Sequence, residues 1–241
     1  MCYLQDMLIS ASHISRIRVF LEFLSSLRMD KDLACTKSVE MDLRGVLNPS
    51  GLLDRLFFRE HRWLDFEAFY DFYLQQNRQR LLAHFPNIPE ELLLPGLKAR
   101  LYRTQCGILT EYQAFLGAQV VFGEEYVSRS LGMDRLGVDF SIRHEEQVYH
   151  IHIFVDSPRA WHYRRIKSVQ KKVDRMEGIH VNLPYALQAG RINSLHFLPN
   201  GFGVYTPAYL RYLQGEITSG RLRQFRVEGV GREGFVYGNV W

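Results

Sequence analysis

Apolar residues recur at intervals of three and four along the first part of the chain, from Ile14 to Leu24. This spacing is typical of an amphipathic helix, and we expect residues 1–90 to be mainly helical. A proline-rich segment at 86–96 interrupts the pattern. Beyond it, residues 97–122 return to the helical spacing and predict one long helix that ends at Gly123.

The apolar residues change to every second position after Gly137. Val138, Phe140 and Ile142 alternate with polar residues, which predicts a strand with one buried and one polar face. Residues 148–156 continue the alternation and predict a second strand.

The four residues His144–Gln147 between these strands predict a hairpin loop. A hairpin closed in this way brings the polar faces of the two strands together. The residues that it places opposite each other are Arg143 and Val148, Ser141 and His150, and Asp139 and His152.

A basic helix is predicted to follow the hairpin. Ser157 and Pro158 form a favourable helix start and Gly178 a favourable end, so we expect a helix over 159–177. Its predicted apolar stripe consists of Ile166, Val169, Val173 and Met176. Its predicted basic residues are Arg159, Arg164, Arg165, Lys167, Lys171, Lys172 and Arg175.

The rest of the chain completes a layered fold. Short strands are predicted at 179–183 and 202–205, with a turn at 199–201 before the second of them and a helix beginning at Thr206-Pro207. Helices followed by strands with an intervening helix are typical of the α/β (α+β) class. We expect residues 1–241 to form a single domain, because a chain of this length buries one sizeable core.

Composition narrows the function classes. Lys and Arg number 30 against 26 Asp and Glu, and the net charge of +4 allows a polyanionic partner without requiring one. Three widely spaced cysteines support neither a disulfide framework nor a cysteine zinc site. No apolar run reaches the roughly 20 residues of a membrane span, and the N-terminus lacks a signal-peptide pattern. We therefore expect a soluble, cytoplasmic protein with no membrane partner.

The strongest candidate chemistry lies in the acidic and histidine-containing hairpin beside the basic helix. Phosphodiester hydrolysis needs carboxylates for a divalent cation, a base, and cations that neutralise the charge on the phosphate. The residues suited to the first two tasks are Asp134, Asp139, His150 and His152, with Glu111 as a further metal ligand. The alternative is an ordinary solvated polar face, on which these residues carry no chemistry.

The basic residues suit a phosphate backbone, because a cationic helix face binds DNA through charge neutralisation and counterion release. A solvated helix face explains the same run of charges, so both interpretations stay open. The candidates for DNA contacts are Arg100, Arg103, Arg164, Arg165, Lys167, Lys171 and Lys172.

A different class of function is also open. Imidazoles at His150 and His152 suit a transition metal in a small-molecule hydrolase or oxygenase. Such a site needs further ligands, and His144, His162 and His180 have no recognised ligand spacing.

Five short segments occur in a characteristic order along the chain. They are Val39–Leu43 with Leu47–Pro49, Gly96–Thr104, Asp134–Asp139, Pro184–Gln188 and Leu198–Phe202. In this order they resemble the TaqI-type family of type II restriction endonucleases, and the similarity runs from about residue 39 to residue 210. No single segment is decisive, but the ordered set is hard to obtain by accident.

The resemblance implies a homodimeric, Mg²⁺-dependent enzyme that cuts double-stranded DNA at a short palindrome, TCGA for the family's namesake. It implies a restriction-endonuclease-like core with a central mixed sheet, which we place at 97–210, followed by a C-terminal extension at 211–241. The helical part would pack on this sheet. Asp134 and Asp139 match the family's two aspartates, and Asp139 is the metal ligand that we predict first.

The sequence departs from the family on the second strand, where the resemblance leads us to expect a lysine. The triplet of acid or amide, any residue and lysine falls on His150-Ile151-His152. Three outcomes are open: His152 takes over the task of the lysine, Lys167 or another residue of the following helix reaches the site, or the protein only binds DNA. Imidazole also suits Mn²⁺ better than Mg²⁺, so Mn²⁺ is the alternative metal.

Overall fold

The computed structural model describes residues 11–35, 43, 45–130, 132–133, 136–169, 176–187, 194–231 and 234–239. They fall into two compact units, which are described one at a time. The helical unit takes its described residues from Arg18–Tyr112 and Pro199–Phe202, and the sheet unit takes its own from Met1–Ile17, Gln113–Leu198 and Gly203–Trp241.

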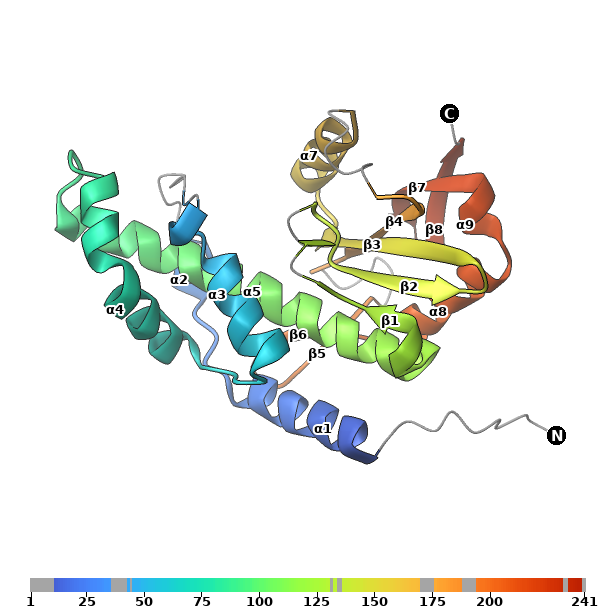
Figure 1. The fold of residues 1–241 in the computed structure, drawn as a ribbon, viewed down its shortest axis with the longest axis horizontal. Helices are drawn as coiled ribbons and strands as arrows, with labels where there is room; N and C mark the ends of the chain where they lie inside the picture. The colour runs from blue at the N-terminus through green and yellow to red at the C-terminus, as the bar shows by residue number, and fades with distance from the viewer. Residues whose placement is uncertain are drawn as a thin grey trace. The chain divides into compact units, whose positions relative to one another are not determined.

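The helical unit is built from helices of very different length (Figure 1), and buried aromatic residues such as Phe57, Phe69 and Tyr73 lie in its core. Asn48 caps α3 by accepting a hydrogen bond from Ser50 N, and Asp65 caps α4 by accepting one from Ala68 N. The elements are most of α1 (Ala11–Ser26), α2 (Lys31–Cys35), η1 (Gly45–Leu47), α3 (Pro49–Asp54), η2 (Arg55–Arg59), α4 (Phe66–His84) and the first part of α5 (Glu90–Phe122).

The long helix α5 begins earlier than the sequence predicts. It starts at Glu90 instead of Leu97 and contains Pro95, so the expected interruption up to Gly96 is wrong. Pro95 lies close to the start of the helix, where the backbone hydrogen bond that proline cannot make is one of the first in the ladder. The predicted end at Phe122 is confirmed, and Gly123 follows with a φ of 101°.

The sheet unit contains a four-stranded mixed sheet in the order β1-β2-β3-β4 (Figure 1). The η3 turn (Glu124–Tyr126) leads into β1 (Val127–Ser128), and β2 (Phe140–His144) pairs with β1 and β3 (Gln147–Val155) antiparallel. β4 (Ile179–Tyr185) runs parallel to β3. The predicted pairs of Ser141 with His150 and Arg143 with Val148 are confirmed.

The hairpin between β2 and β3 is tighter than predicted. His144 pairs with Gln147, so Glu145 and Glu146 alone form the turn and the expectation of a four-residue loop is wrong. Glu145 adopts a φ of 53°, which a two-residue turn demands. Arg223 holds the turn, because its Nη2 donates to Glu145 Oε2 at 2.8 Å.

One face of this sheet is apolar and lies in the core of the sheet unit. Phe140, Tyr149, Ile151 and Leu183 are fully buried there. They share one cluster with Ala114, Ala118 and Val121 of α5 and with Tyr209, Leu210, Leu213 and Ile217 of α8 (Pro207–Thr218). The alternation that predicted the strands thus also identified their core face.

The C-terminal part adds two small antiparallel sheets to the same unit. β5 (Leu195–Phe197) pairs with β6 (Gly203–Tyr205), so the predicted strand at 202–205 forms outside the four-stranded sheet. Thr206 caps α8 through Tyr209 N, as predicted. A hairpin of β7 (Phe225–Gly231) and β8 (Gly234–Asn239) follows α9 (Arg221–Gln224).

The prediction of a mixed α/β fold, with a helical N-terminal part and a mixed sheet, is confirmed. The single-domain organisation with its boundaries at 90, 97 and 210 stays a prediction. Among the described residues, no helix combines the length and the apolar character that a bilayer crossing requires.

Candidate active site

The second face of the four-stranded sheet carries polar side chains, and most of them are buried. Ser141, His150 and His152 are each 2% exposed, and Asn182 is 5% exposed. The register places His150 beside His180 and His152 beside Asn182. Because alternate residues of a strand share a face, these side chains form one polar surface opposite the core.

Asp139 lies at the edge of this polar face, immediately before β2. Its backbone N donates to Ile151 O at 3.0 Å, and its Oδ2 accepts a hydrogen bond from Ile153 N at 2.5 Å. β2 begins one residue later, at Phe140. The Asp139 carboxylate therefore accepts the hydrogen bond from Ile153 N that a backbone carbonyl of a neighbouring strand would otherwise accept. Asp139 is half-buried and therefore retains contact with solvent.

His150 is fixed by hydrogen bonds at both ring nitrogens. Nε2 donates to the carbonyl oxygen of Glu177 at 2.9 Å, so Nδ1 accepts from the hydroxyl of Ser141 at 2.7 Å. A side chain at Gly178 would meet His150 Nε2 at 2.7 Å, which explains why glycine follows Glu177.

His152 is equally enclosed and is electrically neutral. Nδ1 donates to Gly137 O at 2.6 Å, and Nε2 lies 2.9 Å from Nδ1 of His180, whose Nε2 lies 3.2 Å from Met176 O. Burial, reinforced by the nearby charge of Arg164, lowers the pKa of His152 to about 2. His152 therefore supplies no positive charge at neutral pH.

Neither of these two imidazoles opens to solvent. His150 and His152 share the predicted face with Ser141, but the protein covers them. An uncovered neutral histidine would bond to water, whereas these two satisfy their nitrogens with protein groups, as buried polar atoms must.

The helix α7 (Pro158–Val169) lies against this polar face with a polar side of its own. Arg164 Nε donates to Asn182 Oδ1 at 2.8 Å, and Asn182 Nδ2 donates to Val227 O at 2.9 Å. Trp161 packs edge-on against Phe154, with ring centroids 4.8 Å apart.

This packing corrects the predicted apolar stripe of α7. Ile166 is 37% exposed, whereas Arg164, expected on a basic outer face, points toward the sheet. The reason is the chemistry of the surface beneath the helix, because a histidine-rich and amide-rich face needs hydrogen-bond donors above it. Val173 of the predicted stripe lies outside the described residues.

The outer face of α7 is basic and aromatic. Arg159, His162, Tyr163 and Arg165 are exposed, and the guanidinium of Arg159 lies over the Tyr163 ring at 5.7 Å. Cations interleaved with an aromatic ring are typical of surfaces that contact nucleic acids.

The other predicted site residues are not brought together with Asp139 by the described structure. Arg100, Arg103 and Glu111 lie on the part of α5 that belongs to the helical unit, where Arg103 Nη1 donates to Leu33 O at 3.3 Å. Their tasks stay predictions. Asp134, Lys171 and Lys172 lie outside the described residues, as does the side chain of Lys167.

The described residues contain no preformed metal site with three or more of the usual ligands, His, Cys, Asp or Glu. Asp139 supplies the kind of oxygen donor that Mg²⁺ prefers. The histidines use their nitrogens in hydrogen bonds within the protein, so this arrangement does not favour a His-ligated small-molecule enzyme.

Sequence reasoning missed the contribution of β4 to the site. His180 and Asn182 alternate with Ile179, Val181 and Leu183, and this alternation already places them on one face. The missing information was the parallel register, which alone brings Asn182 beside His152.

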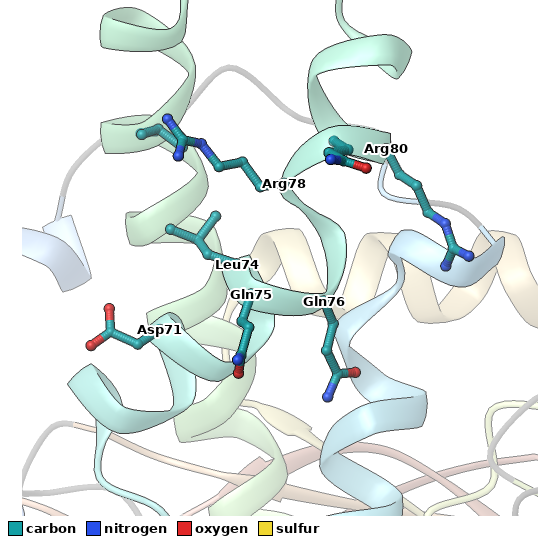
Figure 2. A pocket seen from close by; sticks show the side chains of 8 residues that line it. Asp71, Leu74, Gln75, Gln76, Arg78 and Arg80 are labelled. Atoms are coloured by element: carbon teal, nitrogen blue, oxygen red, sulfur yellow. The ribbon is translucent and has the colours of Figure 1, made fainter.

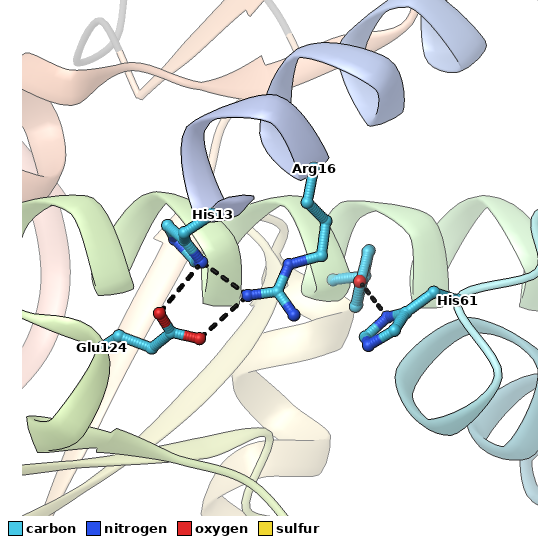
Figure 3. A network of polar contacts seen from close by, with 5 residues as sticks. His13, Arg16, His61 and Glu124 are labelled. Atoms are coloured by element: carbon cyan, nitrogen blue, oxygen red, sulfur yellow. Dashed lines mark hydrogen bonds and ion pairs between the residues drawn. The ribbon is translucent and has the colours of Figure 1, made fainter. Parts of the chain in front are cut away.

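Figure 3 shows a further polar cluster of the sheet unit, formed by His13, Arg16 and Glu124. Arg16 Nη2 donates to Glu124 Oε1 at 2.9 Å and to His13 Nδ1 at 2.6 Å. Burial lowers the pKa of His13, although the charge of Glu124 opposes this effect. The cluster joins the start of α1 to η3 and contains no nucleophile, so we interpret it as structural.

The helical unit has polar features of its own. Nδ1 of His61, which is labelled in Figure 3, lies 3.0 Å from the hydroxyl of Tyr112. A hollow of about 840 Å³ lies along α4 (Figure 2), with Asp71, Arg78 and Arg80 in its lining. Arg78 is paired with Glu90 at 2.8 Å. The lining contains none of the residues that the sequence singled out.

Comparison with known proteins gives one match. Residues 16–192 match the model of the family described as TaqI restriction endonuclease, which is most of the chain and includes the hairpin, α7 and β4. No curated protein and no solved structure matches the chain.

Proposed function

Because the chain belongs to the TaqI restriction endonuclease family, a family of type II restriction endonucleases, we propose that it hydrolyses phosphodiester bonds of double-stranded DNA at a short palindrome. The observation that carries the proposal is the half-buried Asp139 immediately before β2, on the polar sheet face against which α7 lies. TCGA is the first target to test, since the family's namesake cuts it.

Asp139 is the centre of the proposed site. The hydrogen bond from Ile153 N fixes its carboxylate, and a fixed carboxylate loses little conformational freedom when it binds a cation. Asp134 is the further ligand that we propose. A bound Mg²⁺, or Mn²⁺ in its place, would supply Lewis-acid stabilisation of the charge on the phosphate.

The proposed reaction is the addition of water to phosphorus. One P–O bond to a sugar breaks, one hydrogen of the water passes to the solvent, and the leaving sugar oxygen takes up a proton to become a hydroxyl. Before this step, the basic residues of the chain would hold the phosphate, and the contacts around Asp139 would keep its carboxylate in position.

His150 and His152 serve this site as positioning residues. His152 bonds the carbonyl of Gly137 and thereby holds the loop that leads into Asp139. His150 joins β2 to the start of β4 through Ser141 and the Glu177 carbonyl. Buried hydrogen bonds of this kind keep neighbouring groups in place, which site geometry requires.

The outer face of α7 is the proposed contact with the DNA backbone. Arg165 and Arg159 are exposed on it, and Lys167, Lys171 and Lys172 continue the basic segment in the sequence. Arg100 and Arg103 of α5 are further proposed contacts. A homodimer matches a palindrome, because its two-fold symmetry presents one site to each strand.

A second candidate function is DNA binding without cleavage. The observation that favours it is the neutral, covered His152 at the position where the resemblance predicts a lysine. In this case the protein binds duplex DNA with an affinity that falls steeply with salt, and leaves the DNA intact.

The decisive experiment is cleavage of a plasmid that carries TCGA sites, in Mg²⁺ and in Mn²⁺. We expect discrete fragments from the wild-type protein and none from Asp139→Ala. Intact plasmid with the wild-type protein in both metals would contradict the cleavage proposal, and a retained gel shift would then support the binding-only function.

A further inference from the structure

One row of residues crosses the polar face of the sheet from Asp139 to α7. Asp139 is bonded to β3 at Ile151 and at Ile153, on either side of His152. His152 pairs in register with Asn182 of β4, and Asn182 Oδ1 accepts the hydrogen bond of Arg164 Nε. The row therefore begins with a carboxylate and ends with a guanidinium.

The two ends of the row lie on either side of the covered His152. Neighbouring strands are about 4.8 Å apart, so the backbone positions of Asp139 and Asn182 are separated by about 10 Å. Asp139 and Arg164 are both half-buried, so each lies at the boundary between the protein and solvent.

A protein cation in this row would assist hydrolysis beside the proposed metal ion. Negative charge increases on the phosphate oxygens as water adds to phosphorus, and a positioned cation lowers the barrier. His152 lies between the two ends of the row but is neutral, whereas the guanidinium of Arg164 carries the charge. Arg164 retains its proton throughout and contributes charge and hydrogen bonds alone.

The position of Arg164 is fixed in a way that differs from the exposed arginines of α7. Asn182 accepts from its Nε, and Val227 O of β7 accepts from the amide of Asn182. This chain of bonds sets the plane of the guanidinium relative to β4. The exposed Arg165 has its place on the outer side of the helix, where contacts with the DNA backbone give affinity.

On these grounds we propose that Arg164, oriented by Asn182, is the cationic catalytic residue that contacts the phosphate to be cleaved, opposite Asp139. The assignment rests on the proposed function and adds a specific task for one residue of α7. The assignment distinguishes Arg164 from the arginines that contact the DNA backbone. It also names the group that supplies the positive charge in place of the neutral His152.

The test uses substitutions that separate the charge of Arg164 from its hydrogen bond to Asn182. Arg164→Gln keeps an N–H donor at the position of Nε and removes the charge, whereas Arg164→Lys keeps the charge and removes both the Nε donor and the planar group. Arg211→Gln is the matched control, because Arg211 is an exposed arginine of α8, which packs on the opposite, apolar face of the sheet. Circular dichroism verifies that each variant is folded.

Two readouts on a TCGA duplex separate catalysis from affinity. We expect the cleavage rate at saturating DNA to fall about 100-fold or more in Arg164→Gln and less in Arg164→Lys, since one positioned donor has an effect of this order. We also expect millimolar guanidinium to restore part of the rate in Arg164→Gln. In EDTA, the slope of log affinity against log salt should decrease by about 0.9 for the lost phosphate contact.

Each outcome decides between defined alternatives. Cleavage by Arg164→Gln at the rate of Arg211→Gln would overturn the assignment of Arg164 and leave the proposed function intact. A weaker affinity of Arg164→Gln with an unchanged rate at saturation would also overturn it, since Arg164 would then be a backbone contact. No cleavage by the wild-type protein in either metal would overturn the proposed function and this assignment together.

Discussion

The two faces of the β2–β3–β4 sheet are built from alternate residues of the same strands, yet they are organised by different forces. On one face, Ile151 and Leu183 pack among apolar side chains of α5 and α8. On the other, His150, His152 and Asn182 are as deeply buried but are joined by directional hydrogen bonds.

The difference teaches that the two faces contribute unequally to stability. Apolar burial stabilises the first face at about 25 cal/mol for each Å² removed from water. Buried polar groups give a net gain of only about 1 kcal/mol per hydrogen bond, and losing a partner is costly. A polar face that is buried at such a modest gain agrees with the proposed task of holding Asp139 and Arg164 in position.

Asp139→Asn gives the largest expected effect and affects function alone. The amide oxygen still accepts the hydrogen bond from Ile153 N, so the free energy of unfolding should change by less than about 1 kcal/mol. The loss of the metal-binding charge should reduce cleavage about 1,000-fold, which corresponds to about 4 kcal/mol of transition-state stabilisation. Plasmid cleavage and urea unfolding of the same preparation measure both quantities.

A strongly destabilised Asp139→Asn protein would contradict the division between the two faces. The side chain would then support the fold as well as the chemistry. Equal cleavage by the variant and the wild type would remove Asp139 from the proposed site.

Ile151→Ala tests the apolar face at the residue between the two histidines. Ile151 is fully buried, and deletion of its side chain should lower the free energy of unfolding by about 2–5 kcal/mol. Urea unfolding measures the change. Ile166→Ala on α7 is the control, because Ile166 is 37% exposed and should lose much less. Similar decreases in the free energy of unfolding for Ile151→Ala and Ile166→Ala would show that the burial of Ile151 does not determine its contribution to stability.

The sequence predicts the strands of this sheet well, because period-two alternation directly reports which residues face the core. Ser141, His150 and His152 were placed on one face by that argument, and the register confirms it. What the alternation does not report is whether the polar face is open to solvent. Whether the polar face is covered depends on which side of α7 packs against the sheet. The prediction placed the apolar side, with Ile166, against the sheet, and it is wrong because Ile166 is 37% exposed.

The contribution of Asn182 shows a second limit. A hairpin register follows from the short turn between β2 and β3, but β4 pairs with β3 in parallel after a long connection. Nothing local fixes such a register, because it depends on packing of the whole unit. For this reason the row that ends at Arg164 became visible only in the structure.

Acidification should destabilise the polar face in a specific pH range. The pKa of His152 is lowered from 6.5 to about 2 by burial, so the unfolded chain binds a proton below pH 6.5 that the folded protein does not. Stability contributed by neutral His152 is therefore complete above pH 6.5 and is lost as the pH falls toward 2. Between pH 6.5 and pH 2, the free energy of unfolding should fall by about 1.4 kcal/mol for each pH unit.

The measurement is urea unfolding of the wild type and His152→Gln at several pH values. Glutamine does not titrate, so the variant should lose less stability on acidification than the wild type. His13, whose pKa is also lowered mainly by burial, contributes a loss of the same sign to both proteins and cancels in the comparison. Parallel pH profiles would show that His152 is accessible to protons in the folded state.

Ser141→Ala gives the smallest expected effect and separates one hydrogen bond of the polar face from the rest. The substitution removes the donor to His150 Nδ1, which lies at 2.7 Å, and should lower the free energy of unfolding by about 1–3 kcal/mol. Ser128→Ala is the matched control, since Ser128 pairs with Ser141 across β1 and β2 but is exposed, and it should change stability by less than about 0.5 kcal/mol. Equal values for the two serines would mean that the bond from Ser141 to His150 adds nothing to stability, and that the other contacts of the polar face maintain it.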